Sequence, residues 1–203
     1  MKKVFSLIVV FAITSSIYSQ TAMNFFMSGL DNVLRKDYRG AVVNFTTAIN
    51  LDPKNAADAY YNRGLCKEKL QDYSGAIVDF TNAIKLDPIL AEGAYYDRGV
   101  CKEKLQDYRG AIVDFNNAIK LDPINAEGAY TDRAICKSIL KDHKGVIEDC
   151  NKAIQLNPKN GKAYYNRGVA KYWLDDKNGA CLDFSMAGEQ GYDAYDAIKN
   201  YCQ

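Results

Sequence analysis

The sequence has no excess of charge of either sign, and this lack limits what it is expected to bind. Its 203 residues include 26 basic and 25 acidic side chains, for a formal net charge of +1. Nucleic-acid-binding proteins normally show a basic excess or stripe, so nucleic acid is not expected as a partner. A composition that is 48% hydrophobic and 25% charged suits one or two folded domains, or one repeat array.

Signals for catalysis and metal binding are also scarce. The single histidine, His143, occupies a turn position where tyrosine stands elsewhere in the chain, and no nucleophile elbow or triad accompanies it. The glycines are spread along the chain and do not cluster into a phosphate-binding loop. The six cysteines form no C-x-x-C pair, which argues against a structural zinc site. We therefore expect no catalytic residues, no metal and no cofactor.

Long apolar runs are limited to the N-terminus. Two lysines precede an apolar run over residues 4–13, and mostly small and polar residues follow it. This is the layout of a secretory signal peptide, which we assign to residues 1–19, with cleavage between Ser19 and Gln20. An uncleaved anchor is the alternative, but the run is shorter than the roughly 20 residues that a membrane-spanning helix needs. We expect an exported protein, periplasmic or secreted, without membrane insertion after cleavage.

What the sequence does contain is an internal repeat. Residues 59–88 and 94–123 are nearly the same, with CKEKLQD and GAIVDF identical in both. The four prolines are 35 residues apart, and each follows Leu-Asp or Leu-Asn: Pro53, Pro88, Pro123 and Pro158. Proline disfavours helical geometry in the residue before it, so each of these sites is expected to close a helix. Each repeat reads as two short amphipathic helices joined by a turn.

Small and large residues recur at fixed phases of this repeat. Three small phases and one large phase are seen: Gly29, Gly64, Gly99, Ala134 and Gly168; Ala41, Ala76, Ala111, Val146 and Ala180; Ala48, Ala83, Ala118, Ala153 and Ala187; and Phe45, Phe80, Phe115, Cys150 and Phe184. A glycine within a helix costs about 1 kcal/mol relative to alanine, so its return at one phase needs a packing reason. We expect close contact between helix backbones there, with the large residue inserted between them.

These phases resemble the tetratricopeptide repeat, and the match covers five units. The resemblance implies an all-α fold, a right-handed α-α superhelix of about five helix-turn-helix repeats. We place this domain at residues 20–203, with repeats at approximately 22–56, 57–91, 92–126, 127–160 and 161–190, and a C-terminal capping helix at 192–202. The chain departs from the family in its mostly 35-residue spacing. It also carries Lys67 and Lys102 where the family usually has an aromatic residue.

Two charged phases change together. Arginine precedes the first small phase and aspartate precedes the large phase in repeats two to five: Arg63, Arg98, Arg133 and Arg167; Asp79, Asp114, Asp149 and Asp183. In the first repeat both are replaced, by Ser28 and Asn44. This joint loss predicts an Arg–Asp pair that bridges the two helices of each later repeat. Two separately solvated faces, each contributing little, are the alternative.

The resemblance also implies a concave groove lined by the first helix of each repeat. The residues at its lining phases are Phe26, Tyr61, Leu65, Tyr96, Val100, Thr131, Ile135, Tyr165 and Val169. Tyrosine and aliphatic side chains suit an extended peptide or a helix as ligand. The alternative is that these aromatics only pack between adjacent helices, which we expect for the outer tyrosines, Tyr60, Tyr95, Tyr130 and Tyr164. The lysine–asparagine clamp of chaperone-binding members is not assembled here.

The cysteines allow several interpretations. Cys66, Cys101 and Cys136 share one phase, where successive repeats place equivalent positions too far apart for a disulfide, so we expect them to be buried. A disulfide between Cys181 and Cys202 could staple the terminal cap, and Cys136 with Cys150 is a less favoured pair. The expected function is a non-enzymatic scaffold that binds a protein or peptide. A structural subunit of a cell-envelope assembly and a thiol or redox protein are the alternatives.

Overall fold

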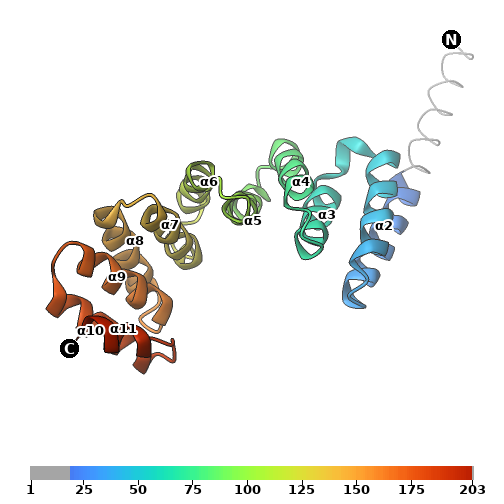
Figure 1. The fold of residues 1–203 in the computed structure, drawn as a ribbon. Coiled ribbons are helices and arrows are strands. Elements are labelled where there is room, and N and C mark those ends of the chain that lie inside the picture. Colours follow the sequence, from blue (N-terminus) through green and yellow to red (C-terminus); the bar gives the residue numbers. More distant parts are fainter. Residues whose placement is uncertain (1–18, 203) are drawn as a thin grey trace, which may run out of the picture. The chain divides into compact units, whose positions relative to one another are not determined.

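The structure is a computed structural model that describes residues 19–202, which form α-helices joined by short turns (Figure 1). The first described helix covers residues 19–34. The following elements are α2 (Tyr38–Leu51), η1 (Pro53–Asn55), α3 (Ala57–Lys69), α4 (Tyr73–Leu86), α5 (Ala91–Lys104), α6 (Tyr108–Leu121), α7 (Glu127–Ile139), α8 (His143–Leu156), α9 (Gly161–Trp173), α10 (Lys177–Glu189) and α11 (Tyr195–Tyr201). Residues 19–202 contain no strand. The prediction of an all-α fold built from helix-turn-helix repeats is confirmed.

Each hairpin turn is built in the same way. In the turn after α3, Gln71 takes a positive φ of 63°, and the amide of Asp72 donates to the carbonyl oxygen of Lys67. This pattern is a Schellman motif, which ends the first helix of the repeat. Asp72 then caps α4, because its Oδ1 accepts a hydrogen bond of 2.9 Å from the amide of Gly75. A Cβ added to Gly75 would lie 2.1 Å from Asp72 Oδ2, so a larger residue here would force the capping side chain to shift.

In the first four repeats the second helix ends at a leucine, and the residue directly before proline is its C-cap, as the spacing predicts. Asp87 and Asp122 are the C-caps of α4 and α6, and each is followed by proline. The side chain of Asp87 accepts a hydrogen bond of 2.8 Å from the amide of Ile89. Asp122 does the same for the amide of Ile124. These aspartates therefore satisfy backbone donors of the loop that leads to the next repeat.

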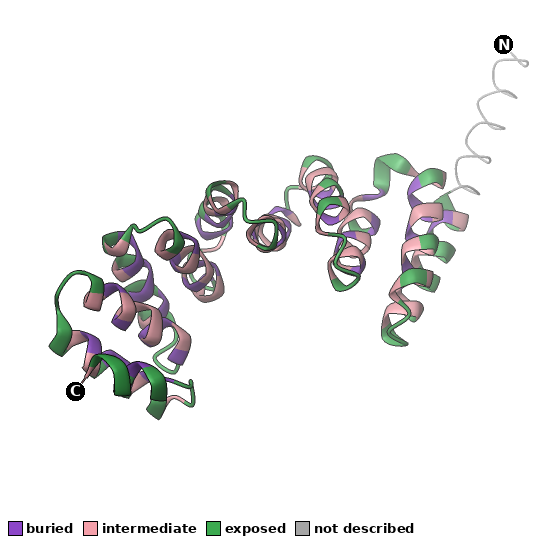
Figure 2. Cartoon of the chain, in the orientation of Figure 1, coloured by how far each residue is buried: buried purple, intermediate pink, exposed green. Residues whose placement is uncertain are grey.

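The small and large phases interlock inside each repeat. Phe80 is fully buried, and a Cβ added to Gly64 would lie 2.7 Å from its ring. Gly29 and Gly168 face the rings of Phe45 and Phe184 in the same way. Repeat four replaces both members, with Ala134 and Cys150, and both are fully buried. Each helix consequently has one buried stripe and one exposed face (Figure 2).

The described chain divides into two compact units. The first ends at Cys101 and the second begins at Lys102, both within α5. In the first unit, α2 packs against α3 and α3 against α4. The second unit contains α6 to α11, in which each helix from α6 to α10 packs on the next. Among the described residues, no helix is both long enough and apolar enough to cross a membrane.

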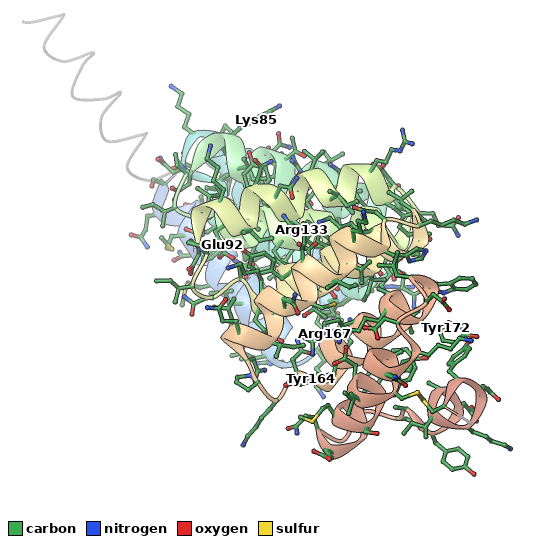
Figure 3. All side chains as sticks on the ribbon, turned by 90° about the vertical axis from the view of Figure 1, so that its left-hand side faces the viewer. Lys85, Glu92, Arg133, Tyr164, Arg167 and Tyr172 are labelled. Atoms are coloured by element: carbon green, nitrogen blue, oxygen red, sulfur yellow. A yellow bond between two sulfur atoms is a disulfide. The ribbon has the colours of Figure 1, made fainter. Side chains whose placement is uncertain are left out.

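The C-terminus closes the second unit. The helix α11 packs against α10, and a disulfide joins Cys181 of α10 to Cys202, with the two Cα atoms 5.6 Å apart. The yellow bond in Figure 3 marks it. The helix begins at Tyr195, three residues later than predicted, and Tyr192 lies in the loop before it. The ring of Tyr192 instead packs on Tyr165, with centroids 5.1 Å apart.

Candidate functional site

The predicted Arg–Asp pairs are seen in repeats two, four and five. Arg63 donates from Nε and Nη2 to the two carboxylate oxygens of Asp79, at 2.9 and 2.7 Å. The same two-bond arrangement joins Arg133 to Asp149 and Arg167 to Asp183. Each pair bridges the first and second helix of one repeat, and each of these aspartates is buried. The joint replacement of both residues in the first repeat correctly indicated this contact.

A lysine also contacts the aspartate in repeats two to five, which the sequence reasoning missed. Lys67 Nζ lies 2.8 Å from Asp79 Oδ2, and Lys102 lies 2.8 Å from Asp114. Lys137 and Lys171 contact the aspartates of repeats four and five in the same way. The lysine stands four residues after the arginine, on the same helix face, so its spacing is the signal that could have revealed it. We call each set of arginine, lysine and aspartate an ion cluster.

The arginine of each ion cluster also connects neighbouring repeats. Arg63 Nη1 donates to Thr46 in the second helix of the preceding repeat, at 2.9 Å. Arg98 donates to Thr81, and Arg133 and Arg167 donate to asparagines at the same phase. One guanidinium thus holds three helices together, which lysine could not do with the same geometry.

The outer tyrosines cover these arginines. The guanidinium carbon lies 5.2–5.4 Å from the ring centroid of the tyrosine three residues earlier, for Tyr60, Tyr95, Tyr130 and Tyr164. Tyr164 and Arg167 are labelled in Figure 3, where they lie together on one side of α9. This distance is that of a cation–π contact. Each outer tyrosine therefore contacts an arginine of its own helix, and the prediction that these residues only pack between adjacent helices stays a prediction.

The first repeat contains a neutral version of the cluster. Asn32 stands at the lysine phase and Asn44 at the aspartate phase. Asn44 Nδ2 donates to Asn32 Oδ1 at 2.7 Å, and Asn32 Nδ2 donates to Asp37 Oδ2 at 2.8 Å. Because Asn44 stands in place of aspartate, no buried carboxylate remains here to be neutralised, and Ser28 stands in place of the arginine. Compared with the later repeats, the arginine, lysine and aspartate are all replaced, by Ser28, Asn32 and Asn44. The two asparagines keep a hydrogen bond without charge.

The predicted groove residues are partly exposed, with one exception. Phe26, Tyr61, Leu65, Tyr96 and Val100 in the first unit are half-buried, as are Ile135, Tyr165 and Val169 in the second. Thr131 is only 3% exposed. Its hydroxyl accepts a hydrogen bond of 2.8 Å from Asn160 Nδ2, the cap of α9. Thr131 therefore contributes to the joint between two repeats rather than to an open surface.

The aromatic groove residues rest on the buried phenylalanines. The ring centroid of Tyr61 lies 5.7 Å from that of Phe80, and Tyr165 lies 5.6 Å from Phe184. Phe26 lies 5.6 Å from Phe45 in the first repeat. One side of each ring is thus fixed by the core, while the residue keeps part of its surface exposed. Rigid aromatic side chains of this kind lose little conformational entropy when they bind a partner.

The hydroxyl of Tyr61 also links two repeats. It donates a hydrogen bond of 2.8 Å to Asp97 Oδ2 in α5. Burial raises the pKa of Asp97 to about 6, the Tyr61 hydrogen bond opposes this rise, and Glu68 and Glu92 add to it by repulsion. Burial and the nearby Asp97 carboxylate raise the pKa of Tyr61 as well. Glu68, Glu92 and Asp97 therefore lie near one another in the first unit.

The four cysteines outside the disulfide are buried: Cys66, Cys101, Cys136 and Cys150. Burial raises the pKa of the Cys66 thiol to about 11 and that of the other three to about 12. The thiolate is the reactive form, so these thiols have little nucleophilic character near neutral pH.

His143 and the two aromatics at the end of α9 have packing partners. The imidazole of His143 stacks on Trp173, with centroids 6.0 Å apart and planes 12° apart. The ring of Tyr172 lies 4.4 Å from that of Tyr201 in the capping helix α11. Tyr172 therefore belongs to the cap, whereas Trp173 packs against the turn of the preceding repeat and remains 65% exposed.

Comparisons with known proteins agree with this geometry. The tetratricopeptide repeat model matches residues 57–89 and 93–125. Solved structures with the same fold include MamA, which is 23% identical, covers 80% of this chain and 94% of its own, and has a TM-score of 0.76. MamA from Desulfovibrio magneticus RS-1 is 20% identical, with 84% and 95% coverage and a TM-score of 0.78.

YrrB, described as a TPR protein with an unusual peptide-binding site, is 19% identical, covers 88% of this chain and 92% of its own, and has a TM-score of 0.77. No curated protein sequence matches the chain significantly. At these identities the structures show a shared fold, and the two matched repeats name the family. Residues 57–89 and 93–125 are tetratricopeptide repeats, and the described residues have the fold of solved tetratricopeptide-repeat proteins.

Proposed function

We propose that the chain is an exported, non-catalytic adaptor that binds a peptide or protein segment along the inner faces of its first helices. The observation that best supports this proposal is that two adjacent tyrosines in one helix have different packing partners. Tyr60 stacks on the arginine of the ion cluster, while Tyr61 rests on Phe80 and stays partly exposed on another face. Tyr164 and Tyr165 repeat this division in α9.

The likeness to YrrB supports a peptide as the ligand, because that protein is described as having a peptide-binding site on the same fold. The thiol chemistry argues against a redox role, because the four free cysteines are buried with raised pKa values. Export is supported by the signal-peptide pattern over residues 1–19 and by the Cys181–Cys202 disulfide, a bond typical of oxidising compartments.

A pull-down from envelope extracts tests this proposal. The bait is the chain from Gln20 onward, as wild type and as a Tyr61→Ala/Tyr165→Ala variant. A matched control carries Val78→Ala and Leu182→Ala, which are 58% and 70% exposed on second helices. We expect the tyrosine variant to lose partners that wild type and control both retain. Equal recovery by all three proteins would contradict binding through the inner face.

Export has a separate test. We expect the full-length chain, expressed in a bacterium with an outer membrane, to be recovered from the periplasm or the medium. Its N-terminus should begin at Gln20. Recovery from the cytoplasm with residue 1 retained would contradict export. It would leave the binding proposal unaffected.

A further inference from the structure

The first described helix differs from the other first helices on its inner ridge. Its four ridge residues are Met23, Met27, Leu30 and Leu34, whose spacing of four, three and four places them on one helix face. Met23, Met27 and Leu34 are 53%, 56% and 83% exposed. In the next repeat the same phases hold Asp58, Asn62, Leu65 and Lys69, three of which are polar. We call the four residues of the first helix the apolar ridge.

A small cavity opens at one end of the apolar ridge, between the first described helix and the start of α3. Its volume is about 100 Å³, and Met23, Phe26 and Ala59 are among its apolar lining residues. Two carboxylates, those of Asp52 and Asp58, also line it. Asp58 is exposed in the first turn of α3, and Asp52 accepts hydrogen bonds of 3.1 Å from Asn55.

Three further carboxylates lie near one another in the first unit. Glu68 in α3, and Glu92 and Asp97 in α5, lie near enough to one another that the first two raise the pKa of Asp97. Lys69 also lies near them, and its Nζ is 3.6 Å from Glu68 Oε1. The first unit thus carries acidic groups on α3 and α5 in addition to the two carboxylates that line the cavity.

We propose that the apolar ridge and its cavity form the binding site for a basic, amphipathic peptide segment, with a lysine or arginine in the cavity. This inference rests on the proposed function and names the chemistry of the partner. The aliphatic stem of the basic residue lies against Met23 and Phe26, and its charged end lies at Asp58 and Asp52. Apolar residues of the peptide cover Met27, and methionine adapts to different shapes.

The occupant is identified by charge and exposure together. Three strongly exposed apolar side chains in one stripe mark a contact surface rather than an ordinary solvated face. An entirely apolar partner would leave the carboxylates of Asp52 and Asp58 desolvated without a counter-charge, which costs free energy. An acidic partner would be repelled by the same carboxylates. A basic segment with apolar neighbours satisfies both features.

Selection from a random peptide display library tests the proposal, with the chain from Gln20 onward as the target. We expect the enriched peptides to carry lysine or arginine beside apolar residues. Asp58→Asn should weaken their binding about tenfold, or about 1.4 kcal/mol. Met27→Ser should weaken it by a similar factor. The matched controls are Glu148→Gln, which removes an exposed carboxylate elsewhere, and Val43→Ser, which removes an apolar residue that is 66% exposed.

Salt provides an independent readout. Binding of a selected peptide to wild type should weaken between 50 and 300 mM salt, and this dependence should be smaller in Asp58→Asn. Circular dichroism of every variant should match wild type, because the substituted residues are exposed.

The outcomes separate this inference from the proposed function. Enriched peptides that are insensitive to Asp58→Asn and Met27→Ser, but lose binding with Tyr165→Ala, would overturn the basic-peptide site and leave the adaptor function standing. Failure to enrich any peptide would count against both. Dimers of the free chain that Met27→Ser dissociates would show that a second copy occupies the apolar ridge, and would also overturn the proposal.

Discussion

Removing the two cations of an ion cluster while leaving its buried aspartate should destabilise the fold strongly. The cluster of Arg63, Lys67 and Asp79 is suited to this test because the Asp79 side chain is 1% exposed. The Arg63→Ser/Lys67→Asn variant leaves this carboxylate without a counter-charge. Breaking a buried ion pair in this way costs about 3–5 kcal/mol. Asp79 would have to become protonated or open to water, and either change weakens the packing of α3 on α4.

Adding Asp79→Asn to this variant should restore most of the loss. The triple variant reproduces the neutral set of the first repeat, in which Asn44 donates to Asn32 at 2.7 Å. It still lacks the hydrogen bond of Arg63 to Thr46, so we expect it to remain about 1–2 kcal/mol less stable than wild type. The triple variant should therefore be more stable than the double variant, although it carries one more substitution.

Urea unfolding followed by circular dichroism measures both variants, and the Asp79→Asn single variant completes the set. The shift in midpoint at constant slope gives the change in stability. A triple variant that is less stable than the double variant would refute the reasoning. So would additive losses from the separate changes, because residues that share one buried charge must be coupled.

Three further predictions concern other parts of the chain. Replacing Cys181 and Cys202 by serine should cost about 3 kcal/mol by the loop-closure relation, seen as a lower melting temperature that reductant no longer changes. Cys150→Phe should cost about 1–3 kcal/mol through overpacking against Ala134, and adding Ala134→Gly should recover stability in urea. The pKa of Asp97 is raised to about 6 in the fold, so the folded state binds more protons and stability should fall as pH rises from about 4 to 6. Asp97→Asn should flatten that part of the stability–pH curve.

Each of these three predictions has a contradicting result. An unchanged melting temperature in the serine variant would mean that the disulfide does not stabilise the cap. A double variant at positions 134 and 150 that is no better than Cys150→Phe would refute the glycine–phenylalanine pairing. A stability–pH curve that is the same for Asp97→Asn and wild type would show that Asp97 titrates normally.

Much of the fold could be predicted because the same residue types recur at the same positions of each repeat. The helix ends at proline, the small–large packing and the Arg–Asp pairing all follow from residues that recur at one phase. Pairing could be inferred because Ser28 and Asn44 change together in the first repeat. The roles of Lys67 and Gly75 were missed, although they recur as well, because each acts through a turn or a helix face that forms only on folding.

The groove could be predicted only in part, because burial depends on contacts between repeats. Thr131 stands at a lining phase, yet Asn160 of the next repeat covers it. The apolar ridge was not recognised as a surface, although Met23 and Met27 share a phase with the polar Asp58 and Asn62. The exposure of a lining-phase residue depends on contacts with the neighbouring repeat, and the sequence of a single repeat does not specify those contacts.

The central claim is that the inner faces of the first helices bind the partner. Hydrogen exchange measured by mass spectrometry, with and without a library-selected peptide, tests it most directly. We predict that the peptide slows exchange in residues 19–34 and in α3, while α2 and α4 exchange as before. Slower exchange confined to α2 and α4, whose exposed valines lie on second helices, would contradict the account.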